Sequence, residues 1–102
     1  MDAVTTEIIW SQIPFGVKMR LGARQAVGDN ARGYLHFTVG PVRRGKPFKV
    51  QIRLDPNDTY TVKLVRCDLR TVEATTLEEA DGLYCDMLGE LLVRWEGRHL
   101  VS

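Results

Sequence analysis

Three short segments of this chain alternate strictly between apolar and polar residues. The most regular is FKVQIRL at 48–54, and YLHFTV at 34–39 and VKMRL at 17–21 have the same pattern. A repeat of two residues is typical of a β-strand that buries one face and exposes the other. The chain is therefore expected to build a sheet with one covered face and one face open to solvent.

Turn-forming residues join these segments into a meander. The sequence DPND at 55–58 separates 48–54 from another apolar run, and its Pro, Asn and Asp residues favour a tight hairpin turn. The connection over 22–33 is longer and is expected to be a loop. The predicted antiparallel sheet has four strands, or five if a less regular last segment is included: 17–21, 34–39, 48–54, 59–66 and 71–77.

Both ends of the chain have helical patterns. The first helix is predicted over 3–13, where Pro14 ends it, and the last over 82–95, where apolar residues recur every three or four positions. Asp81 is the expected N-cap of the last helix, although a capping-box pattern that begins at Thr76 would start it earlier. With both helices on the covered face of the sheet, the 102 residues form one two-layer α+β domain.

Charge is distributed unevenly along the chain, although the formal net charge is only +1. Nine of the fourteen Lys and Arg residues lie between Gly16 and Arg53, where Asp29 is the single acid, whereas residues 54–102 contain ten acids and five bases. Such segregation gives a molecule electrostatically complementary regions, which bears on its partners and not on its fold. A protein partner or a second copy of the chain is therefore expected.

The outward positions of the predicted sheet would form a basic face that also carries aromatic rings. Nucleic-acid binding is one reading, because bases can stack on such rings while the cations contact phosphates. The other reading is a solvated face, since long basic side chains are usually exposed in any protein. The residues of this candidate nucleic-acid face are Lys18, Arg20, Tyr34, His36, Lys49, Arg53 and Lys63.

Two further features point to a protein partner. Trp10 lies outside the apolar stripe of the first helix, and an exposed Trp is a typical interface anchor. The alternative is a Trp10 ring buried between the first and last helices. The most basic loop of the chain contains Arg43, Arg44 and Lys46. These three residues and Trp10 form the candidate protein interface.

The sequence contains no pattern for catalysis, a nucleotide or a metal ion. His36 and His99 have no Ser, Cys or carboxylate at an interpretable spacing, and no glycine-rich phosphate loop is present. Cys67 and Cys85 lack the spacing of a metal-binding pair and are expected to be reduced thiols. We therefore predict a protein that is not an enzyme and that takes no cofactor, metal or small-molecule substrate.

Nothing in the sequence indicates a membrane protein or a secreted one. No apolar run approaches the ~20 residues of a membrane span. The first residues of the chain carry acids and lack the basic flank of a secretory signal. The predicted location is the cytoplasm, without membrane binding.

The chain has four segments in a characteristic order, which cover nearly its whole length: IPFGVKMRLGARQAV, YLHFTVG, VQIRLDPNDTYTVKLVR and ADGLYCDMLGELLVRW. In this order it resembles small uncharacterised proteins encoded by tailed bacteriophages and mobile elements of actinobacteria. The resemblance implies no catalytic motif and no site residues, but it implies a host cytoplasm as the setting. The leading hypothesis is a non-enzymatic interaction protein that binds a host factor or itself. Nucleic-acid binding through the open basic sheet face is the alternative.

Overall fold

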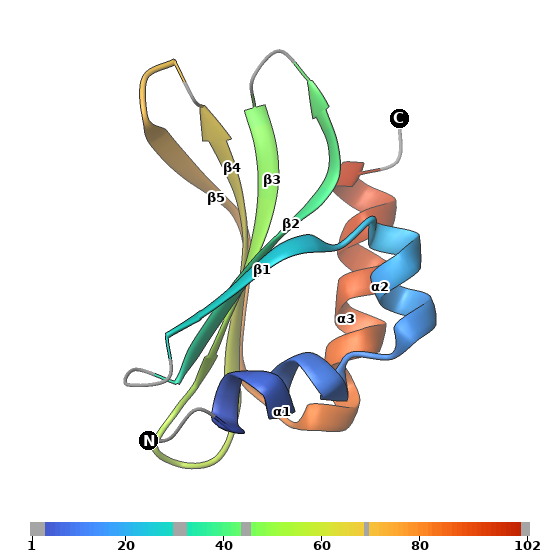
Figure 1. Cartoon of the computed structure of the whole chain (residues 1–102), viewed down its shortest axis with the longest axis vertical. Coiled ribbons are helices and arrows are strands. Elements are labelled where there is room, and N and C mark those ends of the chain that lie inside the picture. Colours follow the sequence, from blue (N-terminus) through green and yellow to red (C-terminus); the bar gives the residue numbers. More distant parts are fainter. Residues whose placement is uncertain (1–3, 30–32, 44–45, 69, 101–102) are drawn as a thin grey trace.

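Five antiparallel strands form a single sheet in chain order, and the helices lie together against one face of it (Figure 1). The computed structural model describes residues 4–29, 33–43, 46–68 and 70–100. The predicted two-layer α+β fold, with both helical ends of the chain on one face of a meander sheet, is confirmed. The elements are α1 (Val4–Gln12), α2 (Phe15–Leu21), β1 (Arg24–Asp29), β2 (Tyr34–Arg43), β3 (Lys46–Leu54), β4 (Tyr60–Asp68), β5 (Glu73–Leu83), η1 (Cys85–Met87), α3 (Leu88–Trp95) and η2 (Glu96–Leu100).

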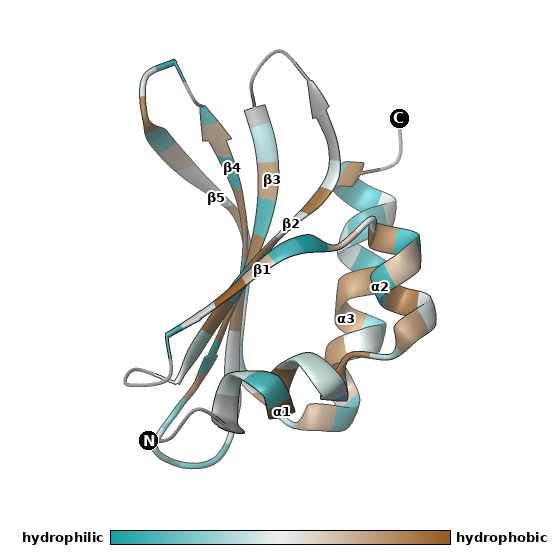
Figure 2. Ribbon diagram, in the orientation of Figure 1, coloured by the Kyte–Doolittle hydropathy of each residue, from teal (hydrophilic) through white to brown (hydrophobic). Residues whose placement is uncertain are grey.

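The covered face of the sheet is an apolar layer built from alternate residues of β2, β3 and β4. These residues lie opposite one another in two rows, and each is at most 3% exposed. Ile9 of α1, Ile13 directly after that helix, and Leu88 and Leu92 of α3 close the layer, so hydrophobic residues meet in the middle of the molecule (Figure 2). Burial of each such side chain contributes about 1.5–3 kcal/mol to stability. The two rows are Leu35, Ile52 and Val62, and Phe37, Val50 and Leu64.

The prediction of a strand over 17–21 is wrong, because these residues belong to the helix α2. Apolar residues at alternate positions of so short a segment also fit a helix, since Val17 and Leu21 are one turn apart. Pro14 precedes the helix in an extended conformation, and Gly22 ends it with a left-handed φ of 65°. Glycine adopts this conformation without steric strain because it has no Cβ. The boundary residues therefore define α2 better than its apolar pattern does.

The first strand is instead β1, which lies within the segment predicted as a loop. It pairs with β2 from Arg24 to Asp29, with a register shift between Arg24 and Val27. Gly28 faces α1, and a Cβ at that position would lie 2.6 Å from the Cβ of Thr6. The absence of a side chain at Gly28 therefore allows α1 to lie directly against this edge of the sheet.

The last helix begins later than predicted, and the fifth strand is longer. β5 runs to Leu83, so Thr76 and Asp81 are strand residues and neither caps a helix. Pairing with β4 continues through two register shifts, and Gly82 has a left-handed φ of 66° near the end of the strand. Long-range strand pairing outweighs the local helical pattern here. The chain enters α3 only after the short turn η1.

Polar contacts between the layers hold both ends of the chain on the sheet. The Tyr60 hydroxyl of β4 donates a hydrogen bond to Gln12 Oε1 of α1 over 2.7 Å. On β5, Glu78 Oε2 lies 2.8 Å from Arg98 Nη1 and 2.9 Å from His99 Nε2 of η2. Hydrogen bonds from Arg98 and then His99 lower the pKa of Glu78. The C-terminal turn is therefore tied to β5.

Candidate interaction surface

The open face of the sheet carries five of the seven residues predicted for the nucleic-acid face. Tyr34 and His36 of β2 point away from the helices, and their ring centroids are 5.8 Å apart at an angle of 53°. β3 places Arg53 opposite Tyr34, and Lys49 and Lys63 occupy outward positions of β3 and β4. The sheet therefore brings two rings and three cations to one face.

Lys18 and Arg20 do not belong to the open face, because α2 lies in the helical layer. Lys18 Nζ lies 4.5 Å from the centroid of the Trp10 ring, and Arg20 Nε lies 2.7 Å from Glu96 Oε1. Glu96 is buried, and a buried carboxylate requires such a partner. The predicted nucleic-acid face thus loses two of its five cations, a correction that follows directly from the helical conformation of α2.

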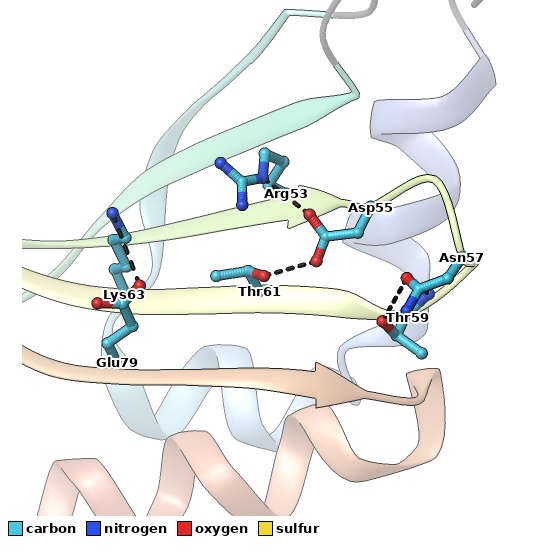
Figure 3. A network of polar contacts seen from close by, with 7 residues as sticks. All are labelled: Arg53, Asp55, Asn57, Thr59, Thr61, Lys63 and Glu79. Atoms are coloured by element: carbon cyan, nitrogen blue, oxygen red, sulfur yellow. Dashed lines mark hydrogen bonds and ion pairs between the residues drawn. The ribbon is translucent and has the colours of Figure 1, made fainter.

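Two of the three remaining cations are paired with carboxylates (Figure 3). Arg53 Nε lies 2.9 Å from Asp55 Oδ1, and Lys63 Nζ lies 3.8 Å from Glu79 Oε2. Exposed pairs of this kind contribute at most about 1 kcal/mol to stability, but they cancel charge that would attract a phosphate backbone. Of the three predicted cations that remain on this face, Lys49 is the one with no ion pair to a described residue.

The two rings of the open face are uncharged at neutral pH. Burial raises the pKa of Tyr34 above its usual value of 10.0, and the charge of Arg53 opposes part of this effect. Burial, and secondly the charge of Lys49, lowers the pKa of His36 below its usual value of 6.5. His36 therefore contributes a neutral ring and adds no positive charge for a phosphate group.

Asp55 organises the turn between β3 and β4 (Figure 3). Its carboxylate oxygens accept hydrogen bonds from Arg53 Nε and, over 2.6 Å, from the Thr61 hydroxyl. The hydrogen bond from Thr61 is the main cause of the lowered pKa of Asp55. Asn57 Oδ1 accepts a hydrogen bond from the Thr59 hydroxyl over 2.8 Å. The polar groups at this end of the open face therefore serve to hold the hairpin.

The candidate protein interface predicted from the sequence is only partly described by the structure. The Trp10 ring is half-buried and meets the Phe37 ring edge-on, with centroids 5.1 Å apart. Arg43 and Lys46 are paired positions at the ends of β2 and β3, and Arg44 lies outside the described residues. Trp10 therefore packs against the core, and its role as an interface anchor stays a prediction.

α2 presents two large apolar side chains to solvent. Phe15 is 75% exposed and Met19 is 68% exposed. The two residues are four positions apart and so lie next to each other, on the side of the helix opposite Val17 and Leu21. We call this pair the apolar ridge. If residues 17–21 formed a strand, Met19 would lie on the covered face. The strand prediction therefore gives no indication of the apolar ridge.

A groove of about 370 Å³ lies between the α1–α2 corner on one side and η1 and α3 on the other. Its walls approach closely because Gly89 has no side chain, and a Cβ there would lie 3.1 Å from Pro14 Cδ and 3.6 Å from Val17 Cγ2. The lining combines an apolar part, Pro14, Val17, Gly89 and Val93, with the acids Asp86 and Glu90. We call the apolar ridge and this groove together the α2–α3 surface.

Comparison with known proteins adds no relative, since no protein-family model, curated protein or solved structure matches this chain. Within the described ranges, no group of three or more His, Cys, Asp and Glu side chains is placed to hold a metal ion. None of the helices in that part of the chain is long and apolar enough to span a bilayer. Cys67 is half-buried and Cys85 is exposed, and both are free thiols. The surfaces must therefore be interpreted from their own geometry.

Proposed function

We propose that this chain is a non-enzymatic interaction protein that binds a protein partner through the α2–α3 surface. The main observation is that Phe15 and Met19 lie largely exposed and side by side on α2. Each large apolar side chain left in water forgoes about 1.5–3 kcal/mol of burial free energy. A partner that covers the ridge would gain that free energy, and aromatic anchors of this kind dominate many protein interfaces.

The groove supports the same proposal because it gives the surface a defined shape. Exposed apolar area beside a concavity is typical of a protein-binding site. The walls of the groove come from elements that the core holds in place, since α2 buries Leu21 and α3 buries Leu88 and Leu92. A surface fixed in this way loses little conformational entropy when a partner binds.

The proposal keeps both partners that the sequence suggests. The resemblance to phage and mobile-element proteins implies a host factor in the host cytoplasm, and the segregated charge favours an asymmetric partner or a second copy. Neither partner requires a catalytic group, because apolar contact supplies the affinity. The charged groups at the groove, Asp86 and Glu90, would then guide orientation.

Nucleic-acid binding by the open face is the second candidate function. The observation in its favour is the pair of neutral rings, Tyr34 and His36, beside the unpaired Lys49. Stacked bases and a phosphate contact fit that arrangement. It is the weaker candidate because Arg53 and Lys63 are paired with carboxylates, and phosphate contacts supply most of the affinity for nucleic acid.

A pull-down with matched variants tests the proposed surface. The tagged protein, a ridge variant (Phe15→Ser with Met19→Ser) and a sheet-face variant (Tyr34→Ala with Lys49→Glu) are each incubated with an extract of the cells that carry the protein. The incubation is done with and without nuclease. We expect a bound protein that survives nuclease, is kept by the sheet-face variant and is reduced about 10-fold or more by the ridge variant. Loss of binding through nuclease or the sheet-face variant would favour the second candidate instead.

A further inference from the structure

We infer that the α2–α3 surface pairs with the same surface of a second copy of this chain. In the resulting two-fold dimer, the apolar ridge of each copy lies in the groove of the other. This inference rests on the proposed function, because it names the partner of the same surface. Three properties of the surface support it: the placement of ridge and groove, the placement of charge, and the available area.

The ridge and the groove share one helix. α2 carries Phe15 and Met19 on its outer side, while Val17 on the same helix, together with Pro14 at its start, forms one wall of the groove. A two-fold axis beside α2 would therefore bring ridge to groove twice in one interface. Such an isologous contact closes on itself, whereas a ridge and groove on distant parts of the surface would generate an open chain of copies.

The charges beside the ridge are opposite in sign to the charges beside the groove. Lys18 and Arg20 flank Met19 on α2, and the side chain of Arg20 stays 60% exposed although it pairs with Glu96. On the other wall of the groove, the side chain of Glu90 stays 82% exposed although its Oε1 lies 3.6 Å from Arg94 Nη2, and Asp86 of η1 is exposed as well. Docking of the ridge would therefore bring cations of one copy to carboxylates of the other. Such complementarity speeds encounter and fixes the relative orientation.

A stable dimer contact would take only a small share of the surface of this molecule. Specific complexes of standard size bury about 800 Å² on each partner. The chain exposes 6248 Å², and its principal extents are 36 × 26 × 21 Å. A contact over α2, the α1–α2 corner and the start of α3 therefore needs only a minor fraction of the surface.

Sedimentation of the full chain over a range of about 1–500 µM tests the inference. We expect the mass to rise from one copy to two, and Phe15→Ser to raise the dimer dissociation constant by about 30-fold or more. Val27→Ser is the matched control, because Val27 is an exposed apolar residue of the open face and its variant should dimerise normally. Both positions are exposed, so equal thermal stability of the two variants verifies that each is folded.

A charge-reversal pair gives an independent readout from the same sedimentation. Glu90→Lys should raise the dissociation constant by about 10-fold, whereas Glu79→Lys, on the open face, should leave it unchanged. A chain that stays monomeric at the highest concentration overturns the inference but leaves the proposed function standing, since the pull-down reports on other partners. A dimer that resists Phe15→Ser also overturns the inference, and the proposed function is overturned with it only if the ridge variant keeps its partner in the pull-down.

Discussion

The two exposed sides of this molecule differ in whether the fold explains the residues that they expose to solvent. On the open face, strand alternation favours polar residues, with the single side chain of Val27 as an exposed apolar exception in β1, and the cations Arg53 and Lys63 have carboxylates beside them. On the helical side, Phe15 and Met19 lie in solvent although no periodicity of the fold requires it. A polar sheet face is stable in water without a partner, whereas an exposed aromatic ridge is not at its lowest free energy. The helical side is therefore the side that calls for a binding partner.

The fold also changes how the uneven charge distribution of the sequence is interpreted. Along the chain, basic residues concentrate before residue 54 and acids after it. In the fold, Arg20 from the basic segment meets Glu96 from the acidic one, and Arg53 meets Asp55. These two ion pairs cancel part of the polarity that the sequence suggests. The charge that bears on a partner is what remains exposed beside the apolar ridge and the groove.

The largest expected effect concerns Trp10. Its substitution distinguishes a residue of the core from a residue of an interface on the helical side. Trp10→Ala should lower the free energy of unfolding by about 2–4 kcal/mol, because the ring packs against Phe37 and under Lys18. Phe15→Ala is the control and should change it by less than about 0.5 kcal/mol, since that ring is exposed. Urea denaturation measures both. A Trp10→Ala protein of unchanged stability would indicate instead that Trp10 is an interface anchor.

Gly28 tests how closely the helical layer contacts the edge of the sheet. Gly28→Ala should destabilise the fold by about 2 kcal/mol, because the new Cβ would lie 2.6 Å from Thr6 and α1 would have to move. Gly16→Ala is the matched change in α2, where a Cβ has free space, and it should stabilise by about 0.5–1 kcal/mol. Thermal denaturation of the two variants measures the difference. Equal effects of the two changes would contradict the close approach of α1 to β1.

Acid titration should affect the attachment of the C-terminal turn. The pKa of Glu78 is lowered in the folded state, so its stabilising contribution is complete above its usual value of 4.5 and is lost as the pH falls below it. Glu78→Gln removes this dependence, and the variant should lose less stability than the wild type between pH 6 and pH 3. The melting temperature measured across that range tests the prediction. Parallel pH profiles would mean that the contact with Arg98 and His99 contributes nothing.

The smallest expected effect belongs to His36 on the open face. Its folded-state pKa lies below the usual 6.5, so the unfolded chain takes up a proton first and stability decreases as the pH falls through that value. His36→Gln should flatten the stability profile between pH 7 and pH 5.5. The imidazole proton resonances of the wild type, followed by NMR over the same range, report the pKa itself. A midpoint above 6.5 would indicate an anionic neighbour and a different open face.

The sheet could be predicted from the sequence because its signal is long and repeated. β2, β3 and β4 include most of the predicted strand residues, and DPND at 55–58 joins two strands as a hairpin. One-sided burial follows from the alternation, so the side on which Tyr34 and Lys49 lie was also predictable. These inferences depend on residues that are neighbours in sequence or in register.

The helical layer could not be predicted equally well, because its signals are short or long-range. Five residues at 17–21 fit both the repeat of a strand and the repeat of a helix. Only the flanking Pro14 and Gly22 distinguish a helix from a strand. The ion pair of Arg20 with Glu96 joins residues 76 positions apart, and no local sequence pattern predicts it. The candidate site on α2 was hidden for the same reason, since the exposure of Met19 follows only once the helix is assigned.

Side-chain NMR with an inert paramagnetic cosolute compares the two sides of the molecule in a single experiment. In the dissociated protein, the Phe15 ring, the Met19 methyl group, the Tyr34 ring and the Val27 methyl groups should all be attenuated, because all four side chains contact solvent. On association, we predict that Phe15 and Met19 become protected while Tyr34 and Val27 stay attenuated. Protection of Tyr34 and Val27, with Phe15 and Met19 still attenuated, would contradict the assignment of the interaction surface to α2 and α3.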